Sequence, residues 1–107
     1  MRNGEITTID GAWSDEANAW VSETICLTGD CWLEITMPEK GRVVVKKAEE
    51  LEGPWPKAFV SEWGGPEFRI RMYGSTKYRY TRIYLTKTPD RIQIAGTNGS
   101  SVVEAIN

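Results

Sequence analysis

The chain contains no histidine, and this absence removes most familiar schemes of catalysis at neutral pH. Histidine is the usual general base at that pH, so Ser-His and Cys-His arrangements are excluded. A glycine-rich phosphate loop is also lacking, because Gly64-Gly65 precedes a proline and a strand. Two carboxylate pairs remain for acid–base work: Glu23 with Glu34, and Glu62 with Glu67. Acidic residues on the solvent face of a sheet have the same pattern, so the sequence predicts a protein that is not an enzyme and needs no cofactor.

Cysteine is scarce as well, with Cys26 and Cys31 as the only two. They flank a turn signal, and a three-residue loop over 28–30 sets Leu27 opposite Cys31 in a hairpin with one consistently apolar face. In that register the two thiols point to opposite faces, so both are expected to be free. Two cysteines without histidine do not complete a tetrahedral zinc site, and no metal site is predicted.

Long hydrophobic runs are absent too, since no apolar stretch approaches the roughly 18 residues that a membrane span needs. No membrane partner is therefore expected. The first five residues lack the charged-then-apolar pattern of a secretory leader, which predicts a cytoplasmic protein. A chain of 107 residues suits one core, so residues 1–107 are expected to form a single domain.

Apolar residues recur with a period close to 2 along nearly the whole chain, with turn residues between short runs. This alternation is typical of strands and predicts an all-β fold, a single antiparallel β-sandwich or jelly-roll-like domain of about eight short strands. The acidic stretch 48–52 is expected to be a loop, because Gly53-Pro54 would end any helix within about one turn. The expected strands cover residues 5–9, 17–27, 31–37, 42–48, 58–63, 67–73, 78–85, 91–95 and 102–105.

Residues 80–85 followed by 90–94 resemble the closing strands of discoidin-like and other galactose-binding jelly-roll domains. The resemblance covers under a fifth of the chain and implies a jelly roll. It transfers no binding residue to this sequence.

Basic residues are concentrated in the segment 67–91, and residues 67–85 within it read as a hairpin with a loop centred on Ser75 and Thr76. In that register Arg69 lies opposite Arg82. Like charges in such a pair are destabilising, so an anion is expected there, either an acidic side chain of this chain or a ligand. The predicted ligand-binding face consists of Arg69, Arg71, Tyr73, Tyr78, Tyr80, Arg82 and Tyr84.

Interleaved arginines and tyrosines have the composition of a platform for phosphates and stacked bases. They are also ordinary strand-surface residues, which acidic side chains such as Glu49, Glu50 and Glu52 would neutralise. We interpret the chain as a non-catalytic binding module that presents this Arg/Tyr face to its partner. The partner is a protein or an anionic macromolecule, such as a nucleic acid backbone or an acidic glycan, and the module is a monomer or a homo-oligomer.

Tryptophan is abundant, with five residues, and Pro54-Trp55-Pro56 holds Trp55 in an extended loop. A stiffened, exposed tryptophan is a good anchor for a sugar ring or a protein pocket. The alternative is a lid packed over an open end of the sandwich. Two further functions therefore stay open: a carbohydrate-binding module that uses Trp55 and possibly Trp32, and an assembly subunit of a virion or fibre or a protein inhibitor. Most of the tryptophans are expected in the core.

Overall fold

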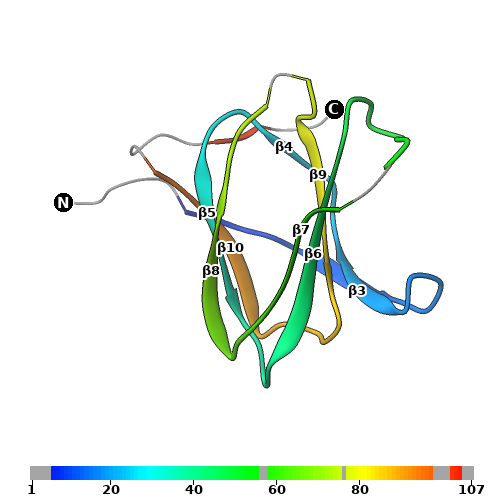
Figure 1. The fold of residues 1–107 in the computed structure, drawn as a ribbon, viewed down its shortest axis with the longest axis vertical. Coiled ribbons are helices and arrows are strands. Elements are labelled where there is room, and N and C mark those ends of the chain that lie inside the picture. The colour runs from blue at the N-terminus through cyan, green and yellow to red at the C-terminus, as the bar shows by residue number, and fades with distance from the viewer. Residues whose placement is uncertain (1–5, 56–57, 76, 98–101, 105–107) are drawn as a thin grey trace.

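The computed structural model of the chain describes residues 6–55, 58–75, 77–97 and 102–104. Within these residues every regular element is a strand. Two antiparallel sheets pack against each other (Figure 1), which confirms the predicted all-β sandwich. The alternating sequence produces this fold because successive strand residues point to opposite faces, so each sheet has one apolar face to bury. The part of the chain described by the structure holds no helix able to cross a membrane.

The smaller sheet has four strands, with β5 and β10 in the middle. Its central strand β5 alternates strictly: Cys31, Leu33 and Ile35 are buried, whereas the residues between them are only half-buried. The sheet therefore has an apolar inner face and a polar outer face. In spatial order its strands are β1 (Ile6–Thr8), β10 (Arg91–Gly96), β5 (Cys31–Thr36) and β8 (Glu67–Met72).

The larger sheet is built around β9 (Tyr80–Leu85). One edge of β9 pairs with β3 and β4, and its other edge pairs with β6. Strands β2, β11 and β7 extend the sheet outward from β3, β4 and β6. Their bounds are β2 (Gly11–Ser14), β3 (Ala19–Ser22), β4 (Ile25–Leu27), β6 (Gly41–Ala48), β7 (Ala58–Gly64) and β11 (Val103–Glu104).

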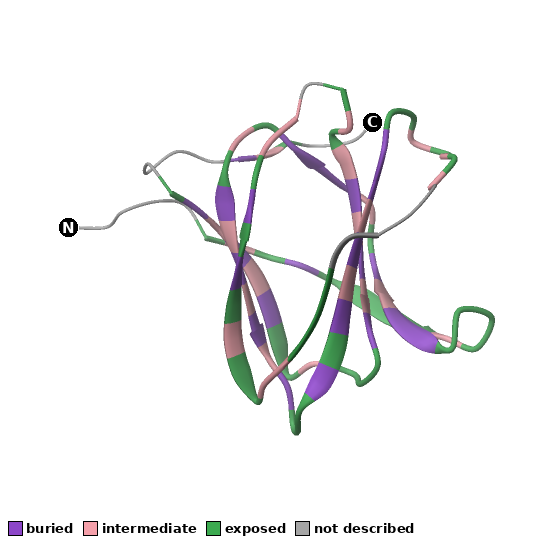
Figure 2. Ribbon diagram, viewed as in Figure 1, coloured by how far each residue is buried: buried purple, intermediate pink, exposed green. Residues whose placement is uncertain are grey.

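The core lies between the inner faces of the two sheets, where the buried segments of Figure 2 alternate with exposed ones. Leu33 from the smaller sheet and Ile83 from the larger are both fully buried. Each such side chain stabilises the fold by roughly 1.5–3 kcal/mol relative to an exposed one. Of the five tryptophans only Trp20 belongs to this core, so the expectation for the tryptophans is wrong. Trp13 and Trp63 are exposed, by 46% and 64%.

Both predicted hairpins are wrong, because in each case the chain crosses to the other sheet instead of turning back. β4 pairs with β9 and β11, whereas β5 pairs with β10 and β8. β8 likewise lies in the smaller sheet and β9 in the larger one. Pairing β8 with β5 sets Arg69 opposite Glu34 and Ile70 opposite Leu33. Opposite charges then share the outer face and apolar residues share the inner face, which the predicted pairing of Arg69 with Arg82 does not achieve.

The expected strand 17–27 divides into β3 and β4 where it runs beside β9, and side chains take over hydrogen bonding at the break. The backbone N–H of Ile83 donates to Ser22 Oγ at 2.9 Å, and that hydroxyl donates to the carbonyl of Glu23 at 2.8 Å. Arg82 Nε donates to Thr24 Oγ1 at 2.9 Å.

Strand β2 was not expected, because the four residues 11–14 lie between turn signals and show no clear alternation.

Candidate functional site

The predicted ligand-binding residues are divided between the outer faces of the two sheets. Arg69 and Arg71 lie on β8 of the smaller sheet, and Tyr73 follows directly after it. Tyr78 lies in the connection between β8 and β9, with Lys77 Nζ 5.3 Å from its ring centroid. The remaining three, Tyr80, Arg82 and Tyr84, lie on β9 of the larger sheet. The structure therefore does not form the single Arg/Tyr face that the hairpin register predicted.

Trp32 joins the first group, because it lies opposite Arg71 on the neighbouring strand β5. The guanidinium carbons of Arg69 and Arg71 lie 4.2 Å and 5.4 Å from the Trp32 ring centroid. Arg71 also lies 5.2 Å from the ring centroid of Tyr73, which is 63% exposed. An arginine stacked on a ring is held in place while its donor groups still point outward. We call Trp32, Arg69, Arg71 and Tyr73 the arginine–tryptophan patch.

Glu34 supplies the anion that was expected beside Arg69. Its Oε2 lies 3.2 Å from Arg69 Nε, and its Oε1 accepts a hydrogen bond from Gln93 Nε2 at 2.7 Å. Glu34 is therefore part of an ion pair on the outer face of the smaller sheet. Glu23 lies by the other sheet, where its Oε2 accepts from the backbone N–H of Asp10 at 3.0 Å. The two carboxylates do not occupy neighbouring strands, which removes the basis on which they were proposed as a pair.

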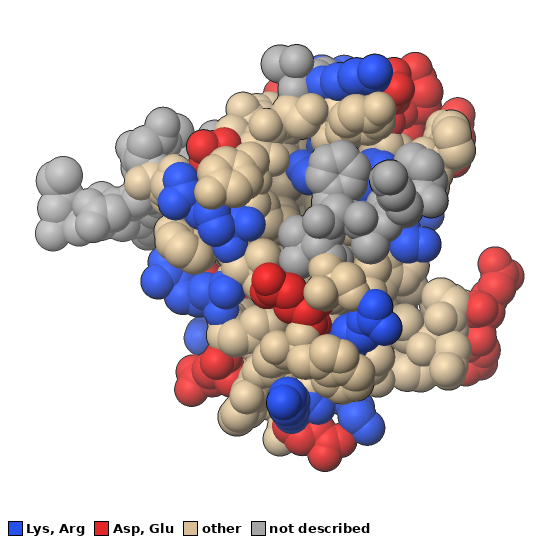
Figure 3. Space-filling model, viewed as in Figure 1, with Lys and Arg blue, Asp and Glu red and all other residues tan. Residues whose placement is uncertain are grey.

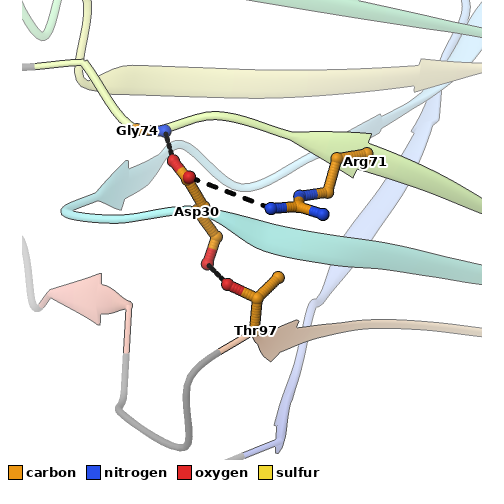
Figure 4. A network of polar contacts seen from close by, with 4 residues as sticks. All are labelled: Asp30, Arg71, Gly74 and Thr97. Carbon is orange, nitrogen blue, oxygen red and sulfur yellow. Dashed lines mark hydrogen bonds and ion pairs between the residues drawn. The ribbon is translucent and has the colours of Figure 1, made fainter.

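Asp30 fixes the end of the patch by joining three segments of the chain (Figure 4). Its Oδ1 accepts from the backbone N–H of Gly74 at 3.0 Å, and its Oδ2 lies 4.0 Å from Arg71 Nη2. Its backbone carbonyl accepts from the Thr97 hydroxyl at 3.4 Å, at the end of β10. The segment that carries Tyr73 is thereby tied to the start of β5.

A shallow groove of about 370 Å³ runs along the same outer face. Its charged lining residues are two cations, Arg69 and Arg91, and two anions, Glu34 and Glu67. Figure 3 agrees, since basic side chains gather over β5 and β8 on the left of the view with acidic ones beside them. This outer face is rich in charge but nearly balanced.

The second group of predicted residues lies against Trp55 on the outer face of the larger sheet. The Arg82 guanidinium carbon is 4.5 Å from the Trp55 ring centroid, and Lys46 Nζ is 5.1 Å from that of Tyr84. Trp55 is half-buried, and its Nε1 is enclosed with no hydrogen-bond partner among the described residues. Trp55 therefore packs against Arg82 of β9 and is only partly exposed, in contrast to the exposed anchor that the sequence predicted.

A buried polar cluster, consisting of Cys31, Lys47 and Thr81, was not predicted from the sequence. Lys47 follows Val43 and Val45 in the inward alternation of β6 and is only 4% exposed. Burial lowers the pKa of Lys47 and raises the pKa of the Cys31 thiol to about 11. The Lys47 charge acts against the rise in the Cys31 pKa, but burial has the larger effect. Both cysteines are free, as expected, and both are buried, although they lie in different sheets.

We expect the free energy of unfolding to contain a Cys31 contribution that is lost as the pH rises from about 9 to about 11. The unfolded thiol releases its proton from its ordinary pKa of 9.0, whereas the folded one holds it up to about 11. The unfolded state then binds fewer protons in this window, so stability falls by up to about 2 kcal/mol. Lys47 acts in the opposite sense. Burial lowers its pKa in the folded state, so the unfolded state binds the proton more tightly and is favoured while the pH is below the ordinary lysine pKa of 10.5.

Denaturant unfolding of the wild type and of Cys31→Ala across this pH range measures the difference. The wild type should lose stability relative to the variant as the pH rises. A constant difference between the two curves would contradict the assignment to Cys31.

Thr81→Val should stabilise the protein by about 1 kcal/mol. Thr81 is fully buried, and its Oγ1 has no hydrogen-bond partner among the described residues. Valine has nearly the same shape as threonine and places a methyl group where the hydroxyl was, so the cost of burying an unpaired hydroxyl is removed. Thr86→Val is the matched control, because Thr86 Oγ1 accepts from the backbone N–H of Arg42 at 2.9 Å and is exposed. Thermal unfolding should show a gain for the first variant and none for the second.

Comparison of the chain with protein-family models, with curated proteins and with solved structures gave no match in any of the three.

Proposed function

We propose that the protein is a non-catalytic binding module that docks a protein partner on the arginine–tryptophan patch. One observation carries the proposal: Arg69 and Arg71 are stacked on Trp32, and the ring of Tyr73 stands exposed beside them. Tryptophan, tyrosine and arginine are the residues that dominate the energetics of protein interfaces. Because the stack exists before any partner arrives, little further side-chain ordering is needed on binding.

The charges of the patch favour a protein over a polyanion. Arg69 lies 3.2 Å from Glu34, and Arg71 lies 4.0 Å from Asp30. A polyanion binds by neutralising its phosphates with basic groups, and the neighbouring carboxylates oppose this. Mixed charges around stacked rings suit the polar rim and aromatic centre of a protein interface.

The alternative functions receive less support from the geometry. A sugar stacks on an open ring face, but Trp32 and Trp55 each carry an arginine guanidinium over the ring. Carbohydrate binding and assembly both stay predictions, and the experiment below distinguishes them from the proposed function.

Site-specific photo-crosslinking tests the proposal. A photoreactive phenylalanine analogue replaces Tyr73 in one variant and Trp63 in another, and both are irradiated in an extract of the cells that naturally make the protein. The two sites match in accessibility, since they are 63% and 64% exposed, but Tyr73 follows β8 of the smaller sheet whereas Trp63 lies on β7 of the larger one. We expect a discrete protein adduct from position 73 only. It should disappear in Arg71→Glu and persist in Arg42→Glu, which changes an exposed arginine on β6.

The outcomes separate the candidate functions. Equal adducts from both positions, or an adduct that survives Arg71→Glu, would remove the patch from consideration. A single-stranded oligonucleotide that binds and is released steeply by salt would replace the protein partner by a polyanion. Protection of position 73 by a neutral oligosaccharide would indicate carbohydrate binding. An adduct of two copies of this chain would indicate assembly.

A further inference from the structure

A pocket of about 450 Å³ lies between β6 of the larger sheet and the end of β8 in the smaller one. This volume is within the range of sites that bind small molecules. The described lining residues are apolar, cationic or small, and none of them is acidic. They are Val45, Met72 and Tyr73, the cations Lys47 and Arg71, and the small residues Gly74 and Ser75.

Lys47 is an unusual residue for this position. Val43 and Val45, which precede it on the inward face of β6, are fully buried, and a third apolar residue would continue the core. Instead the strand places an ammonium group there with 4% exposure. The Lys47 Nζ donates to the backbone carbonyl of Tyr73 at 3.3 Å, which holds the ammonium group beside the end of β8.

Thr81 adds a second polar group at the same depth. It lies opposite Lys47 in the pairing of β6 with β9, and its buried Oγ1 has no hydrogen-bond partner among the described residues. The interior at this end of the sandwich therefore carries a cation and a hydroxyl that packing alone does not require. Arg71 contributes a second cation at the pocket, and it is exposed.

We propose that this pocket binds a small amphiphilic carboxylate, with its acid group against Lys47 and Arg71 and its apolar body against Val45, Met72 and Tyr73. A carboxylate at this place would meet the buried Lys47 ammonium and the exposed Arg71 guanidinium, which also lies 4.0 Å from Asp30, and charge-assisted hydrogen bonds are strong where water is partly excluded. The hydrocarbon part removes apolar wall area from water. The pocket shares Arg71 and Tyr73 with the arginine–tryptophan patch, but it reaches inward to Val45 and Lys47, and the proposal does not depend on the docking of a protein partner.

Titration with octanoate, followed by NMR, tests the proposal. Methyl-labelled methionine reports directly, because Met72 lines the pocket whereas Met37 lies in the core away from the lining. We expect saturable shifts of the Met72 methyl group and of the Gly74 and Ser75 amides. The neutral isostere octanamide should bind the wild type about tenfold more weakly or worse.

Two matched variants complete the test. Lys47→Met keeps the hydrocarbon stem and removes the charge, so octanoate affinity should fall about tenfold or more. Lys46→Met makes the same change one residue earlier, on the outer face of β6, and should leave the affinity unchanged. Equal binding of octanoate and octanamide, undiminished affinity in Lys47→Met, or no saturable shift at Met72 would overturn the proposal. The comparison of the two probes on the wild type decides the matter even where Lys47→Met does not fold.

Discussion

Gly74→Ala is expected to lower the free energy of unfolding by about 3 kcal/mol. A Cβ at position 74 would lie 2.7 Å from Gly29 Cα and 2.8 Å from the Gly29 nitrogen. These are backbone atoms, so no side-chain rotation relieves the clash. The backbone N–H of Gly74 also donates to Asp30, and separating the two segments would break that hydrogen bond. Denaturant unfolding measures the loss.

Gly29→Ala is the matched control for this prediction. A Cβ at Gly29 would meet the Cγ1 atom of Val102 at 3.1 Å, a side-chain atom that can move. Its cost should stay below about 1 kcal/mol, as for mild overpacking that the surroundings relieve. Equal losses in the two variants would show that the contact between the two glycine backbones is not the cause.

Ser22→Ala is expected to destabilise the protein by about 2 kcal/mol, the cost of leaving a buried hydrogen-bonding group without a partner. Ser22 is 5% exposed and its hydroxyl accepts from the Ile83 N–H at 2.9 Å. That N–H lies where the pairing of β9 with β3 and β4 is interrupted. No backbone carbonyl replaces the hydroxyl, so the variant leaves the donor unpaired in the centre of the larger sheet.

The control for Ser22→Ala is the same substitution at an exposed hydroxyl. Ser14 Oγ accepts from the backbone N–H of Ala17 at 3.1 Å in a surface turn. Because water can replace that acceptor, Ser14→Ala should change stability by about 0.5 kcal/mol or less. Thermal unfolding of both variants provides the comparison. A Ser22→Ala protein as stable as the wild type would show that another group satisfies Ile83.

The strands were predictable because the information for them is local. Alternation over four to eight residues located β5, β6 and β9 to within a residue or two. The pairing of the strands was not predictable in the same way, because it depends on residues far apart in the sequence. Glu34 and Arg69 meet across the sheet although they lie 35 positions apart in the sequence. A turn signal between two strands favours a hairpin but does not show whether the chain remains in the same sheet.

The sequence nevertheless contained two signals of the true arrangement. The predicted hairpin placed Arg69 opposite Arg82, and such an unfavourable pair is itself evidence against the register. The positions Val43, Val45 and Lys47 share one face by alternation, so a buried lysine was deducible once that face was known to be the core. Trp32 joined the patch only through the β5–β8 pairing, which no local pattern reveals.

The position of β8 at the edge of the smaller sheet gives its arginines a second effect. β8 pairs with β5, and no other described strand pairs with it. An unpaired strand edge can recruit the edge of another molecule and start aggregation, and charged side chains oppose this. Glu67, Arg69 and Arg71 alternate along β8 on its exposed face. Arg69 and Arg71, which we assign to partner recognition, are thus also expected to oppose edge-to-edge pairing of β8 with another copy of the protein. A variant that reverses one of these charges keeps a charge on the edge, so charge reversal is a better test of the patch than charge deletion.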